Sequence, residues 1–341
     1  MESSPLPPIS VVVLAAGQGK RMKSAQPKVL HPIGGKSMLA RVLETARQLR
    51  PAKICVVYGH GGDQVRAALA DQPSLEWANQ EPLLGTGHAV LQAMPHVAPD
   101  GVTLILYGDV PLISAKTLEG LVQIARNNRL AWLTQTVEDP SGLGRILRTA
   151  DGRIAAIVED KDATSAQRAI KEINTGFVAC PTSLLAGWLP KLGSQNAQGE
   201  YYLTDILAMA VAEGVAVETT QPKNAWEVVG VNSKDQLAAL EREFQLECAR
   251  RLMVDGVMLA DPARIDIRGD VVCGTDVAID VNCIFEGAVS LADGVRVGAN
   301  CILRDCSVGA ASQILPYTFV DGATIGTNAH IAPYARIRPA I

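Results

Sequence analysis

The most constraining feature of the sequence is a period of six residues that begins at Ile265 and runs to Ile341. Small or aliphatic residues recur at this period, and the residue two positions after each of them is apolar. The period shortens by one residue at Cys306 and again at Ala323 before it resumes. Because neither an α-helix nor an alternating β-strand repeats every six residues, the pattern predicts a parallel β-helix with about 18 residues in each triangular coil.

Four of the seven cysteines fall on inward positions of these coils, namely Cys273, Cys283, Cys301 and Cys306. No two cysteines have the Cys-x-x-Cys spacing. We therefore expect reduced, buried cysteines that pack as small apolar residues, rather than a disulfide framework or a zinc site.

The sequence before the repeats alternates between short β-branched runs and segments of helical length. The strand-like runs are 9–14, 54–58, 102–107 and 131–137, and the helix-like segments are 37–49, 63–69, 87–94 and 115–127. This alternation predicts an α/β fold with a Rossmann-like sheet, mixed but mainly parallel, and helices on both faces. In such sheets, ligands bind beyond the carboxyl ends of the strands.

An amphipathic segment joins the two parts of the chain. Leu237, Leu240, Phe244 and Cys248 are spaced by three and four residues, as on one face of an α-helix. We therefore predict three segments: an α/β domain over 1–232, a linker helix over 233–255 and a partial β-helix over 256–341.

The composition excludes several classes of partner. Thirty-one Lys and Arg residues against 35 Asp and Glu give a net charge of −4, and only 4% of the residues are aromatic. Without a basic excess, the chain is not expected to bind nucleic acid or an anionic membrane. The run Met1–Pro5 lacks the basic start of a signal peptide, and no apolar run reaches about 18 residues. We therefore expect a cytoplasmic protein with no membrane insertion.

A glycine-containing loop, LAAGQGKRM, follows the first strand-like run. It is not a dinucleotide-binding fingerprint, because Met22 stands where the third glycine is required. It is not a Walker A loop either, because one residue separates Gly17 from Gly19 and Arg21 follows Lys20. A loop without bulky side chains can bring N–H groups close to a polyphosphate, with Arg21 and Lys28 as cations. Spacing alone leaves an ordinary strand-to-helix turn with solvated cations equally open.

The same loop, followed by Pro27 and Lys28, resembles the signature of sugar-1-phosphate nucleotidylyltransferases. Further segments occur in the matching order: VYGHGGDQV, QEPLLGTGHA, LYGDVPLI, DPSGLGRI, IVEDKDAT, EINTGFV, NAQGEYYLTDI and VNSKDQLAALER. Together they resemble the bifunctional family of N-acetylglucosamine-1-phosphate uridylyltransferase/glucosamine-1-phosphate N-acetyltransferase. The resemblance implies Mg²⁺-dependent transfer of UMP from UTP to N-acetylglucosamine-1-phosphate, with release of pyrophosphate, for peptidoglycan and lipopolysaccharide precursors. It also implies a left-handed β-helix and a homotrimer formed through it.

The resemblance further implies a set of site residues. The residues expected around the nucleotide are Leu14, Ala15, Ala16, Gly17, Gln80, Gly85 and Thr86, with Arg21 and Lys28 on the phosphates. Tyr107, Gly108 and Asp109 are expected beneath the reacting phosphate, and Asp109 and Asn232 are expected to hold Mg²⁺. The residues expected around the N-acetyl sugar are Gly144, Glu159 and Asn174, with Tyr202 and Thr204 as weaker candidates.

Each of these residues also has a plainer interpretation. Asp109 precedes Val110 and Pro111 and is a suitable turn residue, and Asn232 is a suitable helix cap. Glu159 lies in a stretch rich in charged residues, where most acids are solvated.

The repeats from Ile265 to Ile341 make about four coils, whereas the acetyltransferase domain of the family is longer. Arg338 matches the family's first acceptor-sugar residue, and the rest of that site has no counterpart. We therefore expect a C-terminally truncated chain, competent for uridylyl transfer and not for acetyl transfer. Two alternatives remain open: another sugar-1-phosphate nucleotidylyltransferase with hexapeptide coils, and a non-catalytic trimeric scaffold that only binds nucleotides.

Overall fold

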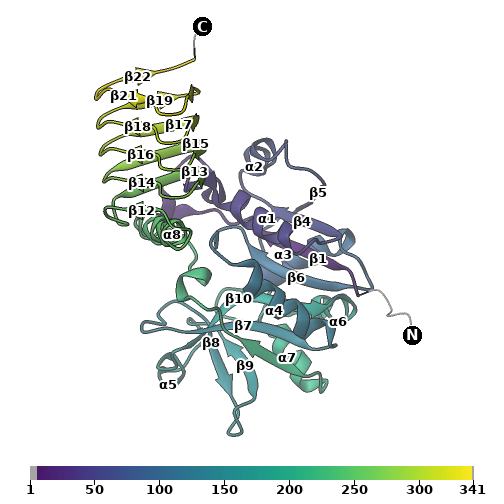
Figure 1. Ribbon diagram of the computed structural model, residues 1–341. Coiled ribbons are helices and arrows are strands. Elements are labelled where there is room, and N and C mark those ends of the chain that lie inside the picture. Colours follow the sequence, from purple (N-terminus) through teal and green to yellow (C-terminus); the bar gives the residue numbers. More distant parts are fainter. Residues whose placement is uncertain (1–5, 340–341) are drawn as a thin grey trace, which may run out of the picture. The chain divides into compact units, whose positions relative to one another are not determined.

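The computed structural model describes residues 6–339 and divides into two compact units (Figure 1). The first unit holds the chain up to His31 together with Met38–Ser233. The second unit holds the segment from Lys234 onward together with Pro32–Ser37. A short hairpin from the early part of the chain therefore belongs to the second unit.

A nine-stranded sheet forms the centre of the first unit, and one half of it is parallel. That half has the order β6 (Val102–Tyr107), β1 (Ile9–Leu14), β4 (Lys53–Tyr58) and β5 (Leu75–Asn79). The other half is mixed, because β10 (Glu172–Pro181) runs antiparallel between β6 and β7 (Leu130–Thr136). Its remaining strands are β8 (Arg145–Arg148), β9 (Ile154–Val158) and β11 (Val217–Thr220).

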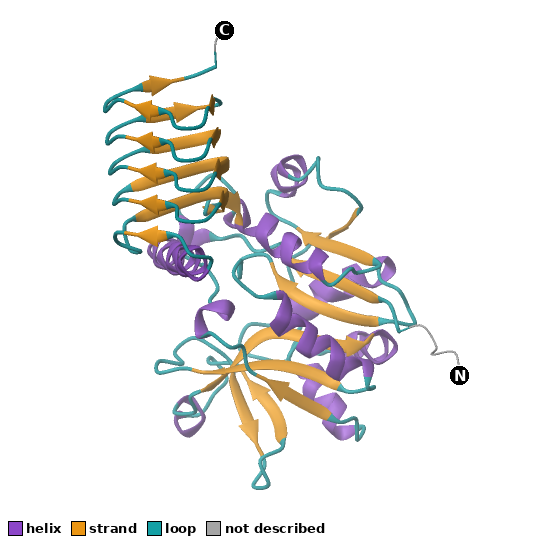
Figure 2. Cartoon of the chain, viewed as in Figure 1, coloured by secondary structure: helices purple, strands orange, loops and turns teal. Residues whose placement is uncertain are grey.

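Helices cover both faces of this sheet, as Figure 2 shows. Successive residues of β1 enter different cores: Val11 and Val13 join one apolar cluster, and Val12 joins the other. This period of two explains why every residue of β1 is buried and why the run is apolar except for Ser10, whose Oγ accepts a hydrogen bond from the N–H of Ala98 at 2.9 Å. One cluster packs against α1 (Met38–Gln48), α2 (Gly62–Ala68) and α4 (Ala115–Arg126). The other packs against α3 (Thr86–Ala93), α6 (Thr182–Trp188) and α7 (Asp205–Ala212). A further short helix is α5 (Ser165–Arg168). The predicted α/β fold is confirmed.

The short 3₁₀ segments of the first unit are η1 (Lys20–Met22), η2 (Lys28–Leu30), η3 (Met94–His96), η4 (Leu189–Lys191) and η5 (Ala225–Val228).

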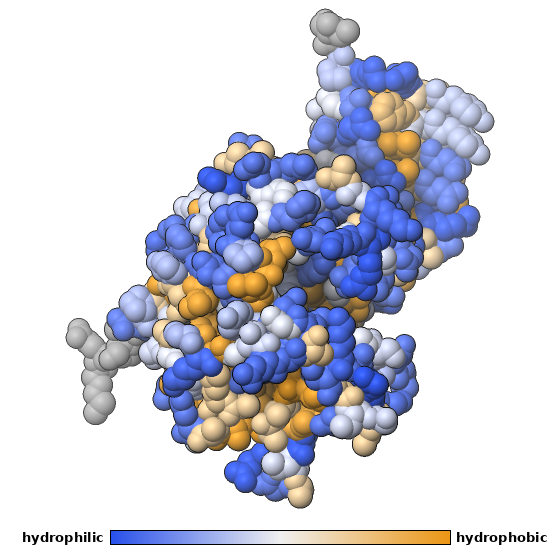
Figure 3. Space-filling model, turned by 180° about the vertical axis from the view of Figure 1, so that it is seen from behind, coloured by the Kyte–Doolittle hydropathy of each residue, from blue (hydrophilic) through white to orange (hydrophobic). Residues whose placement is uncertain are grey.

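No helix within residues 6–339 has the length and apolarity needed to cross a membrane. The surface seen from behind is mostly hydrophilic, with small hydrophobic areas between polar ones (Figure 3).

The second unit contains the predicted parallel β-helix, whose strands pair in parallel from coil to coil. One sheet has the order β12 (Met258–Leu259), β14 (Ala278–Ile279), β16 (Arg296–Val297), β18 (Gln313–Ile314) and β21 (His330–Ile331). The other has the order β13 (Ile265–Cys273), β15 (Cys283–Leu291), β17 (Ile302–Val308), β19 (Phe319–Asp321) and β22 (Arg336–Ile337), with β20 (Thr324–Ile325) beside β17.

The strand register follows the sequence period closely. Ile265 pairs with Cys283, and after a register shift Val289 pairs with Cys306, one position sooner than a full coil would place it. The shortening at Cys306 is therefore visible as an irregularity in the ladder. The last inward position, Ile341, lies outside the described residues.

Small inward residues of the β-helix carry hydrogen-bond donors for the backbone of the next coil. The Sγ of Cys283 donates to the carbonyl of Gly298 at 3.2 Å, and the Sγ of Cys301 donates to that of Leu315 at 3.3 Å. One coil later, the Oγ1 of Thr318 lies 2.7 Å from the carbonyl oxygen of Leu315 and 3.2 Å from that of Ala332 in the next coil. Burial raises the pKa of the Cys283 thiol to about 12, so this cysteine is protonated and serves in packing. All seven cysteines are free, and all except Cys273 are buried.

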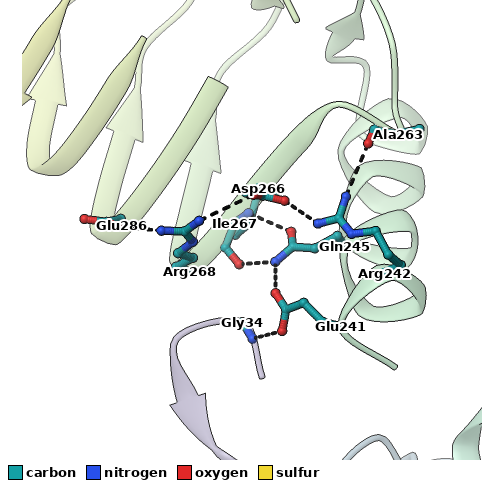
Figure 4. A network of polar contacts seen from close by, with 9 residues as sticks. All are labelled: Gly34, Glu241, Arg242, Gln245, Ala263, Asp266, Ile267, Arg268 and Glu286. Atoms are coloured by element: carbon teal, nitrogen blue, oxygen red, sulfur yellow. Dashed lines mark hydrogen bonds and ion pairs between the residues drawn. The ribbon is translucent and has the colours of Figure 1, made fainter. Parts of the chain in front are cut away.

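Helix α8 (Lys234–Val254) closes the first edge of the β-helix (Figure 4). Strand β13 ends its sheet, so the backbone of Ile267 has no further strand to pair with. The side-chain amide of Gln245 takes that place: its Nε2 donates to the Ile267 carbonyl at 2.8 Å, and the Ile267 N–H donates to its Oε1 at 2.6 Å. Gln245 is 1% exposed, so this pairing is shielded from water.

The hairpin of β2 (Pro32–Ile33) and β3 (Lys36–Ser37) joins the same network. The N–H of Gly34 donates to Glu241 Oε2 at 2.8 Å, and Gln245 Nε2 donates to Glu241 Oε1 at 2.7 Å. Gly35 has φ +82°, and a Cβ there would lie 2.7 Å from the carbonyl oxygen of Arg268. Glycine is thus required for the close approach of this hairpin to the first coil.

Candidate functional site

A cavity of about 450 Å³ lies beyond the carboxyl ends of the parallel strands. Leu14 ends β1, Tyr107 ends β6, and Gln80 directly follows β5, so neighbouring strands deliver their last residues to one place. The lining residues are Leu14, Ala15, Ala16, Gly17, Gln18, Lys28, Val29, Gln80, Leu83, Gly85, Thr86, Ala89, Tyr107, Asp109 and Glu200. Most of the residues expected around a nucleotide therefore share one cavity.

The glycine loop and Lys28 are packed against each other. Gly19 has φ +58°, and a Cβ there would lie 2.7 Å from the Cβ of Lys28. The turn that carries Lys28 is held by its neighbours Val29 and Leu30, which are buried in the core. Gly19 is therefore required both for the backbone conformation and for the passage of the Lys28 side chain.

Lys28 extends to the two residues expected to bind a metal ion. Its Nζ contacts Asp109 Oδ2 and lies 3.1 Å from Asn232 Oδ1. Asn232 is brought to Asp109 by the backbone, since the N–H of Val231 donates to the Asp109 carbonyl at 2.9 Å. A carboxylate and an amide oxygen thus converge on one cation.

This donor set fits a divalent metal ion. Both atoms are hard oxygens, and the Lys28 ammonium between them shows that the point favours positive charge. Within residues 6–339, no cluster of three or more His, Cys, Asp and Glu could hold a metal by itself. A metal held by one Asp and one Asn would complete its shell with substrate phosphate and water, as Mg²⁺ usually does.

The far end of this cavity is built around Gln80, which is 5% exposed. Its Nε2 donates to the carbonyl of Gly85 at 2.9 Å and lies 3.3 Å from His88 Nδ1. Gly85 has φ +101°, and a Cβ there would lie 2.7 Å from the carbonyl oxygen of Tyr201. Thr86 Oγ1 accepts a hydrogen bond from the N–H of Leu203 at 3.1 Å. The Gln80 amide nitrogen is thus engaged, which directs its Oε1 toward other donors.

A second cavity of about 550 Å³ contains Glu159, Asp162, Tyr202, Thr204 and Asp205 in its wall. The pKa of Glu159 is raised, mainly because the carboxyl is buried. The Thr204 hydroxyl, 3.4 Å from Glu159 Oε1, acts in the opposite direction and lowers this pKa. The nearby carboxylates of Asp162 and Asp205 raise it further. Burial and Asp162 likewise raise the pKa of Asp205. The cavity therefore carries concentrated negative charge that hydroxyl donors of a ligand would relieve.

Tyr107 lies close to the acids of both cavities. Burial raises the pKa of its phenol, and the carboxylates of Glu159 and Asp109 raise it further. Gly176 lies against the ring: a Cβ there would be 2.5 Å from Tyr107 Cε2. The strand that carries Asn174 and Gly176 can therefore pass Tyr107 only because residue 176 is glycine.

Gly144, Glu159 and Asn174 come together, although they are far apart in sequence. A Cβ on Gly144 would lie 3.3 Å from both carboxyl oxygens of Glu159, and the N–H of Asn174 donates to the Gly144 carbonyl at 2.8 Å. Asn174 Oδ1 accepts from the indole of Trp132 and from the N–H of Gly176, both at 2.7 Å. Its Nδ2 is thereby turned away from these donors and remains available to a ligand oxygen.

Six expected site residues do not line either cavity: Gly144, Asn174 and Asn232, whose contacts are described above, and Arg21, Gly108 and Arg338. Arg21 is exposed on η1, and Gly108 is buried beneath the site against Leu39, Val29 and Ala15. Arg338 belongs to the second unit, where its Nε lies 3.8 Å from Asp321 Oδ2.

Sequence reasoning missed several residues of the first cavity. Gln18, Leu83 and Glu200 line it, and His88 contacts Gln80. Only Gln18 had a usable signal, because it stands between the two glycines of the loop.

Comparison with known proteins shows the family of this chain. A model of the MobA-like NTP transferase domain matches residues 11–176. The bifunctional protein GlmU of Nitrosospira multiformis is 58% identical over 97% of this chain and 72% of that relative. The bifunctional protein GlmU of Azoarcus sp. is 56% identical over 97% of this chain and 73% of that relative. The chain belongs to the GlmU family.

A solved structure supports the fold. A nucleotidyl transferase from Methanothermobacter thermautotroptrophicus matches with a TM-score of 0.50 and 20% identity, covering 69% of this chain and 97% of that one. Membership of the GlmU family makes the chain a nucleotidyltransferase with UDP-N-acetylglucosamine pyrophosphorylase activity. Enzymes of this family use a divalent metal and nucleotide-sugar substrates. The alternatives of a non-catalytic scaffold and of a different sugar nucleotidylyltransferase are therefore set aside.

Proposed function

We propose that the chain transfers UMP from UTP to N-acetylglucosamine-1-phosphate, that the metal is Mg²⁺, and that the two cavities hold the nucleotide and the sugar. The observation that carries this proposal is the meeting of Lys28, Asp109 and Asn232 in the cavity lined by the glycine loop. A cation and two metal-binding oxygens beside a loop without bulky side chains suit a triphosphate with its metal.

In the reaction, an oxygen of the sugar-1-phosphate attacks the α-phosphorus of UTP in line with the bond to the β-phosphate. A new P–O bond forms, the α–β bridging bond breaks, and its electron pair leaves with pyrophosphate. Lys28 would neutralise charge on the phosphates, and the exposed Arg21 would contact their outer oxygens. Mg²⁺, held by Asp109 and Asn232, would supply further charge neutralisation when bound.

The uracil ring would lie against Gln80, Gly85 and Thr86. Because Gln80 Nε2 is engaged by Gly85, its Oε1 is placed to accept the N3–H of uracil. Cytosine has no hydrogen on that nitrogen, so this contact would select uridine nucleotides.

The N-acetyl sugar would lie near Gly144, Glu159 and Asn174, with Tyr202 and Thr204 beside it. Glu159 can accept hydrogen bonds from sugar hydroxyls, and Asn174 Nδ2 can donate to a sugar or acetamido oxygen. We also propose a cytoplasmic homotrimer assembled through the β-helix, with Arg338 binding the acetyl-acceptor sugar.

The test is product formation by the purified chain from UTP, N-acetylglucosamine-1-phosphate and Mg²⁺, measured as pyrophosphate release and as UDP-N-acetylglucosamine on anion exchange. Other nucleotides and sugar phosphates replace each substrate in turn, and Mn²⁺ or Ca²⁺ replaces Mg²⁺. Asp109→Asn is expected to lower the rate by about 100-fold or more, as for removal of a preorganised charge contact, while the exposed Asp100→Asn leaves it unchanged. Wild-type activity in Asp109→Asn at saturating Mg²⁺ would contradict the proposed metal site.

A further inference from the structure

The position of the Lys28 ammonium has a consequence for metal binding. Its Nζ contacts Asp109 Oδ2 and Asn232 Oδ1, the same two oxygens that fit the divalent metal. The Lys28 side chain is 11% exposed and that of Asp109 is 20% exposed, so water screens this ion pair only weakly. An ammonium and a divalent cation cannot both use the same oxygen lone pairs at close range.

Lys28 is held in place by its surroundings, so its ammonium is a tethered cation. The Cβ of Lys28 passes directly beside Gly19, and the next two residues are buried in the core. A tethered group competes at a high effective concentration, whereas a free ion competes only at its concentration in solution. Lys28 also lines the cavity that the glycine loop forms, where a triphosphate would offer its ammonium other oxygens.

We propose that Lys28 is a built-in competitor of the divalent metal at Asp109 and Asn232. Free metal then binds weakly, and it binds strongly once a triphosphate draws the Lys28 ammonium away. The metal therefore enters together with the nucleotide rather than before it. This inference rests on the proposed metal site, and it gives Lys28 a role in the order of binding besides its role on the phosphates.

The experiment measures Mn²⁺ binding to nucleotide-free protein, with free Mn²⁺ quantified by electron paramagnetic resonance. The variant is Lys28→Met, which keeps the length of the side chain beside Gly19 and removes the charge. The matched control is Lys20→Met, an exposed lysine of the same loop. Loss of one charge-assisted hydrogen-bonded competitor is expected to tighten Mn²⁺ binding by about 10- to 100-fold in Lys28→Met, with no change in Lys20→Met.

The added double variant Lys28→Met/Asp109→Asn shows where the metal binds. Tight Mn²⁺ binding in Lys28→Met that is lost in the double variant supports the proposal. Binding in Lys28→Met no tighter than in the wild-type protein overturns it, as does a gain that survives in the double variant. If thermal unfolding shows that Lys28→Met does not fold, Lys28→Gln carries the same expectation.

Failure of this inference is distinct from failure of the proposed function. The wild-type protein is assayed in parallel for UDP-N-acetylglucosamine formation with Mg²⁺. If it is active and Asp109→Asn is not, the metal site stands, even when Lys28→Met gains no affinity for Mn²⁺.

Discussion

Replacement of Gln245 by leucine tests how the first edge of the β-helix is closed. The side chain is 1% exposed and pairs with both the N–H and the carbonyl of Ile267, which is itself buried. Leucine is close in size but forms neither bond, so two backbone groups lose their partners. Each buried group left unpaired costs about 1–3 kcal/mol, and the added apolar burial returns about 1–2 kcal/mol. We therefore expect a loss of about 3 kcal/mol in the free energy of unfolding of the second unit.

The assay is urea unfolding followed by circular dichroism, together with hydrogen exchange at the Ile267 amide. That amide is expected to exchange faster in Gln245→Leu than in the wild-type protein. Gln313→Leu, at an exposed position of the same unit, serves as the control and is expected to change stability by less than about 0.5 kcal/mol. Gln245→Glu is expected to be at least as harmful as leucine, because it places a carboxylate beside Glu241. A change below about 1 kcal/mol in Gln245→Leu, with unaltered exchange at Ile267, would refute the reasoning.

Two further predictions concern the first unit. Gly19→Ala introduces a Cβ 2.7 Å from Lys28 Cβ at a backbone φ of +58°. We therefore expect kcat/KM for UTP to fall about 10-fold or more and the free energy of unfolding to fall by about 1–2 kcal/mol. The control is Gly120→Ala, whose Cβ meets nothing within 4 Å and which should leave kcat/KM unchanged. Glu159→Gln should raise the stability at neutral pH, because burial raises the pKa of this carboxyl and makes its charged form unfavourable in the folded protein. This gain in stability should shrink as the pH falls through the pKa of the folded state, and it should vanish below the ordinary glutamate range. The same variant should have a higher KM for the sugar phosphate. Thermal unfolding from pH 4 to 8 measures the stability and steady-state kinetics measure KM; a gain in stability that is independent of pH would contradict the assignment.

The sequence was most informative where the structure depends on neighbours in the chain. A β-helix repeats one local arrangement, so residues such as Ile265, Cys283 and Cys301 have the same environment in successive coils and leave a periodic trace. Even the shortened coil is visible, because removal of one residue at Cys306 displaces every later inward position. The alternation of strands and helices in the first unit is local in the same sense, and it was sufficient to predict the α/β fold.

The candidate site depends on contacts between distant residues, and spacing did not reveal them. Lys28 is 81 residues from Asp109 and 204 residues from Asn232, yet all three meet at one point. From its local sequence, Asp109 was also suited to be a turn residue, and Asn232 was also suited to be a helix cap. Their positions were predicted through the resemblance to a family, and their roles as metal ligands remain a prediction. His88 and Glu200 gave no local sign of their place beside the cavity.

By itself, the sequence determined the two architectures and the order in which they follow along the chain, because hydrophobic periodicity acts over a few residues and survives in any tertiary setting. Only the tertiary structure decided that a hairpin at 32–37 packs with the β-helix, and that Gln245 substitutes for the strand missing beside Ile267. It also decided that a lysine ammonium occupies the point where two metal-binding oxygens meet. The physical reason is that such contacts join groups with no regular separation in sequence, so they take shape only when the chain is folded.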